Sequence, residues 1–439
     1  PVFVSKGGSA NGFFPGKIGA MVRIRKPDRS PALWWFLAAL AGGCLEAQEW
    51  TRFRGPNGTG ISTARTIPTM LGASNLVWKT DLSGAAHSSP VLWGNRLFVN
   101  TTSGDGGGFV VVCLDADQGD VLWKNDFPLE PFSKHKFNSF ASSSPVVDAE
   151  RVYALWGEPD HYRVAALDHA GKRIWERDLG PFVSQHGPGI SPMLYEDRII
   201  VGNEQDGESS ILALEAKTGK TLWQTPRRSA VAAYSTPCVY QPDGGEPALI
   251  FNSQAHGIYA VRPADGRVLW EFDQAFDKRS VSSPVLAGNV ILGSCGSGGG
   301  GSFVTAVRPG DPANGRAPAL AYQVRKSAPY VPTSVSRDGL AWLWSDGGIV
   351  TCIAANTGEI RYQERVGGNF FGSPVWVDGR LFCVSTSGEI VVLKAGDSFE
   401  VLHRYPLGEL CHTTPAVARE RMFVRTETRL IALGAVEHR

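Results

Sequence analysis

Histidine and hydroxyl-bearing residues recur just before a series of Ser/Thr-Pro steps, and their types could do chemistry. Imidazoles bind protons or metals near neutral pH, and hydroxyls and amides hydrogen-bond sugars, carboxylates or ions. None is assigned a catalytic role, and His87 and His186 are the first to test. The alternative is that these groups only satisfy backbone N–H and C=O groups. The expected binding set is His87, Ser88, Asn138, Ser142, His186, Tyr234, Ser235, Ser282, Thr333, Ser373, His412 and Thr413.

Metal and phosphate motifs are weak by comparison. Six cysteines follow residue 47 without Cys-x-x-Cys spacing, which predicts small buried hydrophobes rather than a zinc site. Thr218–Thr221 resembles the end of a phosphate-binding loop, but Leu214 replaces the required glycine. The glycine-rich stretches 104–108 and 296–301 predict flexible hairpin tips. Asp346 is a candidate cation ligand without a visible partner, and no metal site is predicted.

The elements that must position these residues come from an internal repeat. Leu214–Trp223 (LEAKTGKTLW) recurs in degraded copies, each followed by a Ser/Thr/Pro step and a β-rich run. Successive anchors are 41 to 55 residues apart, and eight units of that length predict a β-propeller. The anchors are Pro90, Pro145, Pro192, Pro237, Pro284, Pro332, Pro374 and Pro415.

An all-β, eight-bladed propeller of four-stranded antiparallel blades follows from these units. One four-stranded sheet cannot bury both faces, so an aromatic residue at the end of each repeat should wedge between neighbouring blades. The expected wedges are Trp78, Trp123, Trp175, Trp223, Trp270 and Tyr362. Tyr322 is the expected substitute in the fifth blade, and Leu402 or His403 in the seventh. Residues before each first strand should line the central channel.

Ring closure is predicted from the two ends of the repeat region. After Pro415 the chain has residues for three strands, around 416–417, 422–424 and 430–433. Upstream, residues 75–82 carry the wedge-strand pattern without three strands before them. We therefore expect this strand to complete the last blade, which removes two exposed sheet edges. Arg52 and Arg54, in the preceding segment, are expected to cap one face of the disc.

The remaining segments indicate export. Residues 1–20 are interpreted as an upstream or mis-set start, 21–47 as a signal peptide, 48–74 as an N-terminal strap and 75–439 as the propeller. Cleavage after Ala47 predicts a periplasmic or extracellular monomer without a transmembrane span, and lipidation of Cys44 is the alternative. The mature chain then has 37 basic and 40 acidic residues, which disfavours nucleic-acid binding.

The repeat resembles that of the pyrroloquinoline-quinone (PQQ)-type propellers, shared by quinoprotein alcohol dehydrogenases and BamB-type lipoproteins. Four stretches, Trp50–Gly60, His87–Val91, Asn138–Ser142 and His186–Pro192, resemble the secreted bacterial PQQ-binding-like β-propeller repeat proteins. This resemblance implies a fold more than an activity. The dehydrogenases stack their quinone on a disulfide between adjacent cysteines and bind calcium through acidic and amide side chains, and this chain has no adjacent cysteines.

The favoured function is therefore an exported, non-catalytic propeller that acts as a binding or protein-interaction scaffold. Its ligand would be an envelope protein partner, a small polar molecule or a glycan, and no cofactor is expected. The alternative is a PQQ- and calcium-dependent dehydrogenase of an alcohol or sugar. A third reading is a polysaccharide-binding module.

Overall fold

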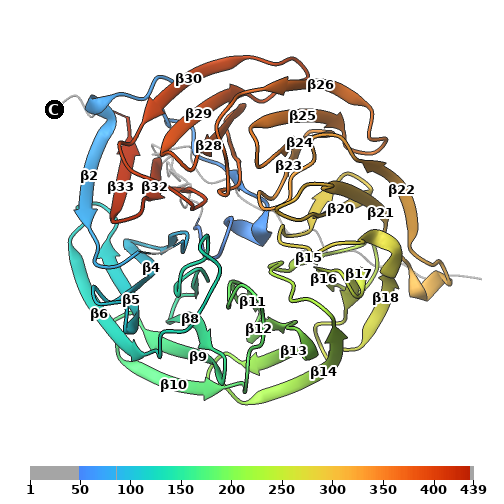
Figure 1. Cartoon of the computed structure of the whole chain (residues 1–439), viewed down its shortest axis with the longest axis horizontal. Coiled ribbons are helices and arrows are strands. Elements are labelled where there is room, and N and C mark those ends of the chain that lie inside the picture. The colour runs from blue at the N-terminus through green and yellow to red at the C-terminus, as the bar shows by residue number, and fades with distance from the viewer. Residues whose placement is uncertain (1–48, 86, 436–439) are drawn as a thin grey trace, which may run out of the picture. The chain divides into compact units, whose positions relative to one another are not determined.

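A ring of eight β-sheets makes up this protein, as seen in a computed structural model that describes residues 49–85 and 87–435 (Figure 1). Each sheet contains a blade of four antiparallel strands, and in seven blades the strands follow chain order from the centre of the ring to its rim. All described residues belong to one compact unit. The expected upstream segment, the signal peptide and Cys44 lie outside the described residues. Within the described part, no helix has the length and apolarity to cross a membrane.

The first four blades have the same strand order. Blade 1 contains β3 (Val91–Trp93), β4 (Arg96–Thr102), β5 (Gly108–Asp115) and β6 (Val121–Pro128). Blade 2 contains β7 (Val146–Val147), β8 (Arg151–Glu158), β9 (His161–Asp168) and β10 (Arg173–Asp178). Blade 3 contains β11 (Met193–Tyr195), β12 (Arg198–Asn203), β13 (Gly207–Glu215) and β14 (Thr221–Ser229). Blade 4 contains β15 (Cys238–Tyr240), β16 (Ala248–Ser253), β17 (Gly257–Val261) and β18 (Val268–Phe272).

The next three blades repeat this order. Blade 5 contains β19 (Val285–Ala287), β20 (Val290–Cys295), β21 (Phe303–Arg308) and β22 (Ala319–Val324). Blade 6 contains β23 (Val335–Arg337), β24 (Leu340–Trp344), β25 (Ile349–Ala354) and β26 (Ile360–Arg365). Blade 7 contains β27 (Val375–Val377), β28 (Arg380–Val384), β29 (Glu389–Lys394) and β30 (Val401–Pro406). Short 3-10 helices occur at Pro56–Gly58, Ala73–Asn75, Asp273–Ala275 and Pro312–Asn314.

The eighth blade joins the two ends of the repeat region, as the sequence predicts. β31 (Ala416–Ala418), β32 (Arg421–Arg425) and β33 (Arg429–Gly434) are completed by β2 (Leu76–Asp81) from upstream. Trp78 pairs with Ala432, and its ring centroid lies 5.9 Å from that of Phe423. The β2 strand therefore closes the ring by antiparallel pairing (Figure 1).

The residues of the repeat motif make contacts between neighbouring blades. The indole Nε1 of Trp175 donates to the Ala216 carbonyl in the turn of the next blade at 3.0 Å. Gly219 in that turn has φ 73°, and a Cβ added to it would lie 2.6 Å from the Trp175 ring. The glycine thus serves both the turn and the ring that packs on it. The equivalent donors in four other blades are Trp78, Trp123, Trp223 and Tyr322.

The irregular seventh blade uses His403 rather than Leu402 at the wedge position. His403 pairs with Val392 in the register that Trp223 has with Ala213. Its Nε2 lies 2.6 Å from the Leu71 carbonyl oxygen. A polar ring therefore replaces the indole where the N-terminal segment, rather than a blade turn, is the neighbour.

A directional series of hydrogen bonds joins the starts of neighbouring blades. In seven of the eight blades, the residue two positions before the first strand carries a hydroxyl that accepts from the backbone N–H of the preceding blade. The Ser89 N–H donates to Ser144 Oγ at 2.9 Å, and the Thr414 N–H donates to Ser89 Oγ at 3.0 Å. The same contact is made to Ser191, Ser283, Thr333, Ser373 and Thr414.

The strap from Glu49 to Asn75 contacts the first strands of blades that are far apart in the ring. The Trp50 carbonyl accepts from Leu92, and β1 (Ile61–Ser62) pairs in parallel with β27. The Arg54 guanidinium is fully buried and donates to the carbonyls of Thr333 and Ser334 at 2.6 and 2.7 Å. Burial lowers the pKa of Arg54 to about 9, so it remains charged at neutral pH.

Arg52 lies against a different blade. It is also buried, and it donates to the Pro237 carbonyl. Burial lowers its pKa to about 10. The two strap arginines therefore bind carbonyls of blades 4 and 6.

Candidate functional site

The approach segments, which lead from the outer strand of one blade to the first strand of the next, bring an aromatic network together at one mouth of the channel. The ring centroids of His87 and His412 are 4.5 Å apart, and those of His135 and His186 are 4.7 Å apart. Contacts through Phe137, Phe371 and Tyr234 connect these pairs. The mouth is thus lined by imidazoles and aromatic rings.

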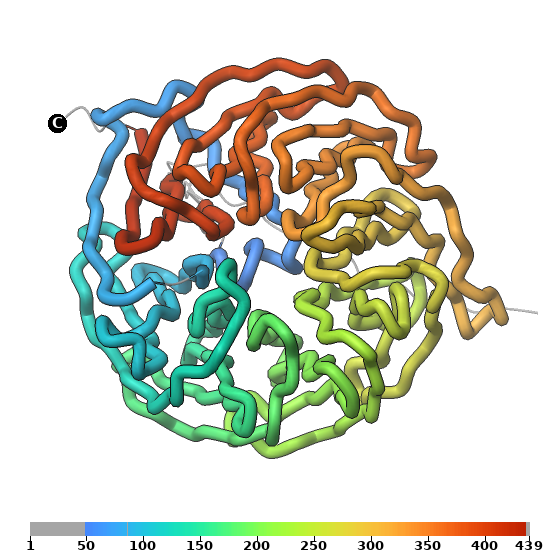
Figure 2. Tube along the Cα trace, in the orientation of Figure 1, coloured from blue at the N-terminus to red at the C-terminus, as the bar shows by residue number. Residues whose placement is uncertain are grey.

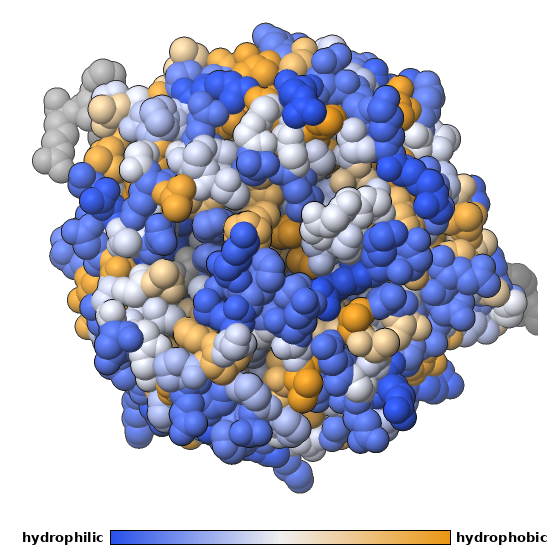
Figure 3. Space-filling model, in the orientation of Figure 1, coloured by the Kyte–Doolittle hydropathy of each residue, from blue (hydrophilic) through white to orange (hydrophobic). Residues whose placement is uncertain are grey.

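One loop of this network spans non-adjacent blades. Phe137 belongs to the connection between blades 1 and 2, whereas Phe371 approaches blade 7, and their centroids are 5.4 Å apart. Figure 2 shows the connection after β6 reaching inward to the centre of the ring. In Figure 3 the centre of the viewed face is bordered mainly by hydrophilic side chains. The loop therefore narrows the access to the channel.

Hydrogen-bond donors converge beside this loop. Arg279 Nη1 lies 2.7 Å from His186 Nε2, and because a guanidinium can only donate, this imidazole nitrogen must accept. The proton of neutral His186 is then on Nδ1. That nitrogen, Arg279 Nε and the Tyr234 hydroxyl are buried without a hydrogen-bond partner in the described chain. Gln185 and Ser184 are the nearest hydrogen-bonding groups to His186 and Tyr234, and both act on the pKa values of these two side chains.

The histidines of this network have both basic and acidic groups near them. Burial, followed by the positive charge of Arg279, lowers the pKa of His186, and burial also lowers the pKa of His412. Burial, with His412, Lys134 and Arg425 nearby, lowers the pKa of His87 to about 3. These three imidazoles are therefore neutral at pH 7, with Arg279 and Asp206 acting on His186 and Glu427 acting on His412.

Several residues expected at the site serve the fold instead. The side chain of Asn138 donates to the carbonyls of His186 and Pro188 at 2.7 and 3.2 Å and accepts from the Ser142 hydroxyl. Ser88 Oγ accepts from the Asn100 N–H at 3.1 Å. The hydroxyls of Ser282 and Thr413 contact Ser294 and the Arg425 carbonyl, and Ser235 is buried. Thr333 and Ser373 belong to the inter-blade hydrogen-bond series. The structure joins His87, His186, Tyr234 and His412 through ring contacts in one aromatic network.

Asp346 is not a free cation ligand. Its carboxylate accepts the backbone N–H groups of Tyr330 and Val331 at 2.7 and 3.1 Å, so its partners are main-chain groups of the adjacent approach segment. Burial raises its pKa. A cation at Asp346 stays a prediction, and its main-chain partners could not be foreseen because they have no signature in the side-chain sequence.

Sequence reasoning missed Arg279, His135 and Phe371 at the mouth. They lie in irregular approach segments, outside the repeat. The only signal of Arg279 and Phe371 is position, because they precede Pro284 and Pro374 by five and three residues, whereas His135 is ten residues before Pro145. That signal selected His87 and His186, and it would have found Arg279 had charged residues been included with hydroxyls and imidazoles.

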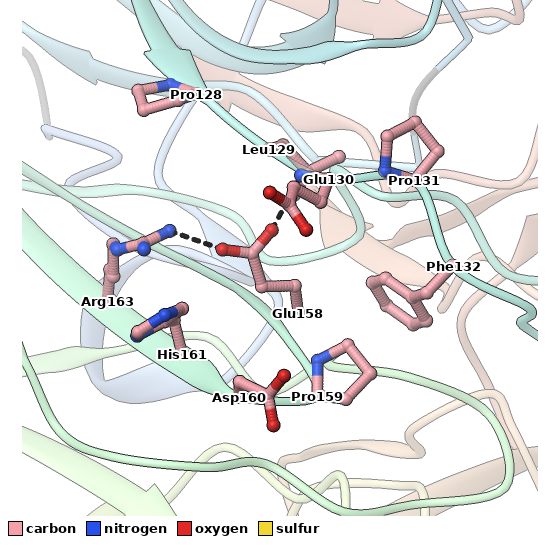
Figure 4. Close-up of a pocket in the computed structure, with 10 residues that line it drawn as sticks. All are labelled: Pro128, Leu129, Glu130, Pro131, Phe132, Glu158, Pro159, Asp160, His161 and Arg163. Atoms are coloured by element: carbon pink, nitrogen blue, oxygen red, sulfur yellow. Dashed lines mark hydrogen bonds and ion pairs between the residues drawn. The ribbon is translucent and has the colours of Figure 1, made fainter.

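A cleft of about 350 Å³ opens away from this donor cluster (Figure 4). It lies between the residues that follow β6 and the hairpin of β8 and β9. Pro128–Phe132 form one wall, and Glu158–His161 with Arg163 form the other. Its central ion pair joins Arg163 Nη1 to Glu158 Oε1 at 2.7 Å.

The architecture and the channel mouth define a propeller of the PQQ-repeat type. The family model described as "Outer membrane protein assembly factor BamB" matches residues 72–179, 107–320 and 346–437. These matches span most of the chain, so the protein belongs to this family.

Individual relatives are more distant. BamB of Moranella endobia is 25% identical over 247 residues, which are 51% of this chain and 59% of that protein. The chain spans less than two thirds of the length of the curated BamB relatives it matches. The structure of BamB from Moraxella catarrhalis has a TM-score of 0.57, with 15% identity and coverage of 83% of this chain and 98% of that chain. These similarities support the assigned family and fold.

A dehydrogenase shares the architecture too. The quinohemoprotein alcohol dehydrogenase of Comamonas testosteroni has a TM-score of 0.63, with 13% identity and coverage of 88% of this chain and 81% of that chain. At this identity the likeness is one of fold.

The mouth residues do not fit a calcium-held quinone. Calcium takes oxygen ligands, whereas the groups that converge at the mouth are imidazole and guanidinium nitrogens and aromatic rings. No three His, Cys, Asp or Glu side chains of residues 49–85 and 87–435 are placed to hold a metal. The six cysteines in these ranges are free and buried in the blades, so none offers a disulfide platform.

Proposed function

We propose that this protein is an exported, non-catalytic propeller that acts as a protein-interaction scaffold and binds an acidic group of its partner at the channel mouth. The observation that carries the proposal is the set of unpaired donors on Arg279, His186 and Tyr234. All three groups can donate, although the Tyr234 hydroxyl can also accept, and a carboxylate is the common protein group that supplies several acceptor sites.

The family gives the kind of partner. Its description names outer-membrane protein assembly, which supports a partner in the bacterial envelope. Export by the segment 21–47 would deliver the propeller to the periplasm or beyond, and a lipid on Cys44 would be the alternative tether. A rigid ring with a polar mouth suits a monomeric adaptor.

Site-specific photo-cross-linking tests this proposal. A photoreactive amino acid at Phe371 reports on the mouth, and the same residue at Ile174, which is 42% exposed on the rim, is the control. We expect a discrete cross-linked envelope protein from the mouth position, lost when Arg279→Gln removes the guanidinium. Equal cross-linking from both positions, or a mouth product insensitive to Arg279, would contradict the proposal.

The second candidate is a quinone-dependent dehydrogenase, favoured by the shared fold with quinohemoprotein alcohol dehydrogenase. PQQ and calcium are added to the purified protein, and binding and dye reduction with alcohols and sugars are measured. Tight binding together with turnover would replace the scaffold proposal. A glycan array tests the third candidate, a polysaccharide-binding module, and a specific glycan displaced by substitution of His186 would favour it.

A further inference from the structure

The cleft between blades 1 and 2 has a buried ionic floor. Glu158 is 6% exposed and accepts from Arg163 Nη1 at 2.7 Å and from the Glu130 backbone N–H at 2.6 Å. Figure 4 shows Glu158 between these two groups, with the Phe132 ring on the other side of the cleft from Arg163. Glu158 is therefore neutralised within the protein, and it fixes the backbone of one wall against the other.

The rim of the cleft keeps an excess of negative charge. Glu130 and Asp160 are exposed, and neither makes an ion pair with any described residue. His161 does not offset them, because its Nδ1 lies 2.5 Å from Asp178 Oδ2 and the imidazole is thereby engaged. After the Glu158–Arg163 pair is set aside, two unpaired carboxylates remain at the opening.

The walls are apolar in contrast. Three prolines, Leu129 and Phe132 line the space, and Leu129 is 4% exposed. Phe132 is supported from behind, since its centroid is 5.1 Å from that of Phe140 and a Cβ on Gly187 would lie 3.2 Å from its ring. An aromatic face held in this way can take an alkyl chain or a cation. The volume, about 350 Å³, is at the small end of ligand sites.

We propose that this cleft binds an alkylammonium group, such as the lysine side chain of a peptide, with its stem against Phe132 and the prolines and its charge between Glu130 and Asp160. The cleft is separate from the donor cluster of the mouth, which selects the opposite charge. This proposal does not depend on the proposed function.

Binding is tested by NMR on the full protein with labelled leucine methyl groups, following Leu129. The probe is N-acetyl-lysine methylamide, and N-acetyl-norleucine methylamide has a similar apolar stem without the charge. We expect a saturable shift from the lysine probe, with a dissociation constant on the order of millimolar, and at least about fivefold weaker binding of norleucine. Raising the salt from about 20 to about 300 mM should weaken only the lysine probe.

Matched variants locate the charge effect. Glu130→Gln with Asp160→Asn should weaken the lysine probe at least about fivefold. Asp243→Asn with Glu246→Gln removes two exposed charges from blade 4, outside the cleft, and should leave binding unchanged. Equal binding of both probes, equal loss in both double variants or no saturable shift would overturn the proposal. If the cleft variant fails to fold, the comparison of the two probes on the unmodified protein still decides.

Discussion

Glu204 should make the stability of this propeller fall as the pH rises through neutrality. It follows β12 and is 3% exposed, and its Oε1 has no hydrogen-bond partner in the described chain. Burial raises its pKa from 4.5 to about 7. Tyr259, Arg227 and Ser253 oppose this rise, and Glu271 adds to it. The carboxyl group is therefore held mostly in its neutral form at mildly acidic pH.

The size of the effect follows from linkage. An acid whose pKa is higher in the folded than in the unfolded protein contributes stability that is fully present below about pH 4.5 and is lost as the pH rises to about 7. At about 1.36 kcal/mol per pKa unit, the loss is about 3 kcal/mol. Glu204→Gln keeps the shape of the neutral acid and cannot ionise. Its advantage over the unmodified protein should be near zero at pH 4.5 and about 3 kcal/mol at pH 8.

Urea unfolding from pH 4.5 to 8.5 measures this difference directly, because the pH dependence shared by both proteins cancels. Glu208→Gln, in the adjacent strand β13 and exposed, is the control and should give a flat difference. A flat difference for Glu204→Gln would refute the reasoning. A variant that is less stable than the unmodified protein at pH 8 would also refute it, since Glu204 would then be ionised and paired with Arg227.

Three further predictions concern the ring, the strap and the mouth. Gly219→Ala should destabilise the protein by about 2 kcal/mol or more in urea unfolding, because it meets both a positive φ and a ring, whereas Gly339→Ala, with φ 80° and open space, should lose only about 1 kcal/mol. Arg54→Leu should cost about 3 kcal/mol in the same assay, because it leaves buried carbonyls without donors. Arg279→Gln should raise the pKa of His186 in an NMR titration, because one cause of its lowering is removed.

The ring of blades could be predicted from the sequence because each blade carries a copy of a short local motif. Each copy of the Thr-Gly and Trp motif specifies a turn and a wedge, and residues 75–82 carried the wedge pattern without a blade of their own. These features led to eight blades and to closure by β2. The contact between Gly219 and Trp175 could not be predicted in the same way. It joins the glycine of one copy of the motif to the tryptophan of the copy in the preceding blade.

The candidate site was harder to predict from the sequence, because its residues lie in connecting segments that do not follow the repeat. Arg279 and His186 meet from approach segments of different blades, and only the folded ring brings them within 2.7 Å. β1, which pairs in parallel with β27, has only two residues and is too short to show a strand pattern in the sequence. Asp346 is bound by main-chain groups that every sequence contains. Hydroxyl residues at fixed positions were visible, and satisfying backbone groups was the alternative considered for them, but their individual partners could not be predicted.

The hydrogen bonds between residues that precede the first strands of neighbouring blades limit how blades can be exchanged between propellers. Each hydroxyl belongs to one blade and completes the main chain of its predecessor, so no sector is self-sufficient. A blade transplanted into another propeller would bring only one partner of the hydrogen bond at each of its two sides. It would fit only a host propeller that has Ser or Thr at the same position before its first strands. Ser and Thr at these positions are therefore explained by contacts between blades. Their recurrence is not by itself evidence of a chemical role.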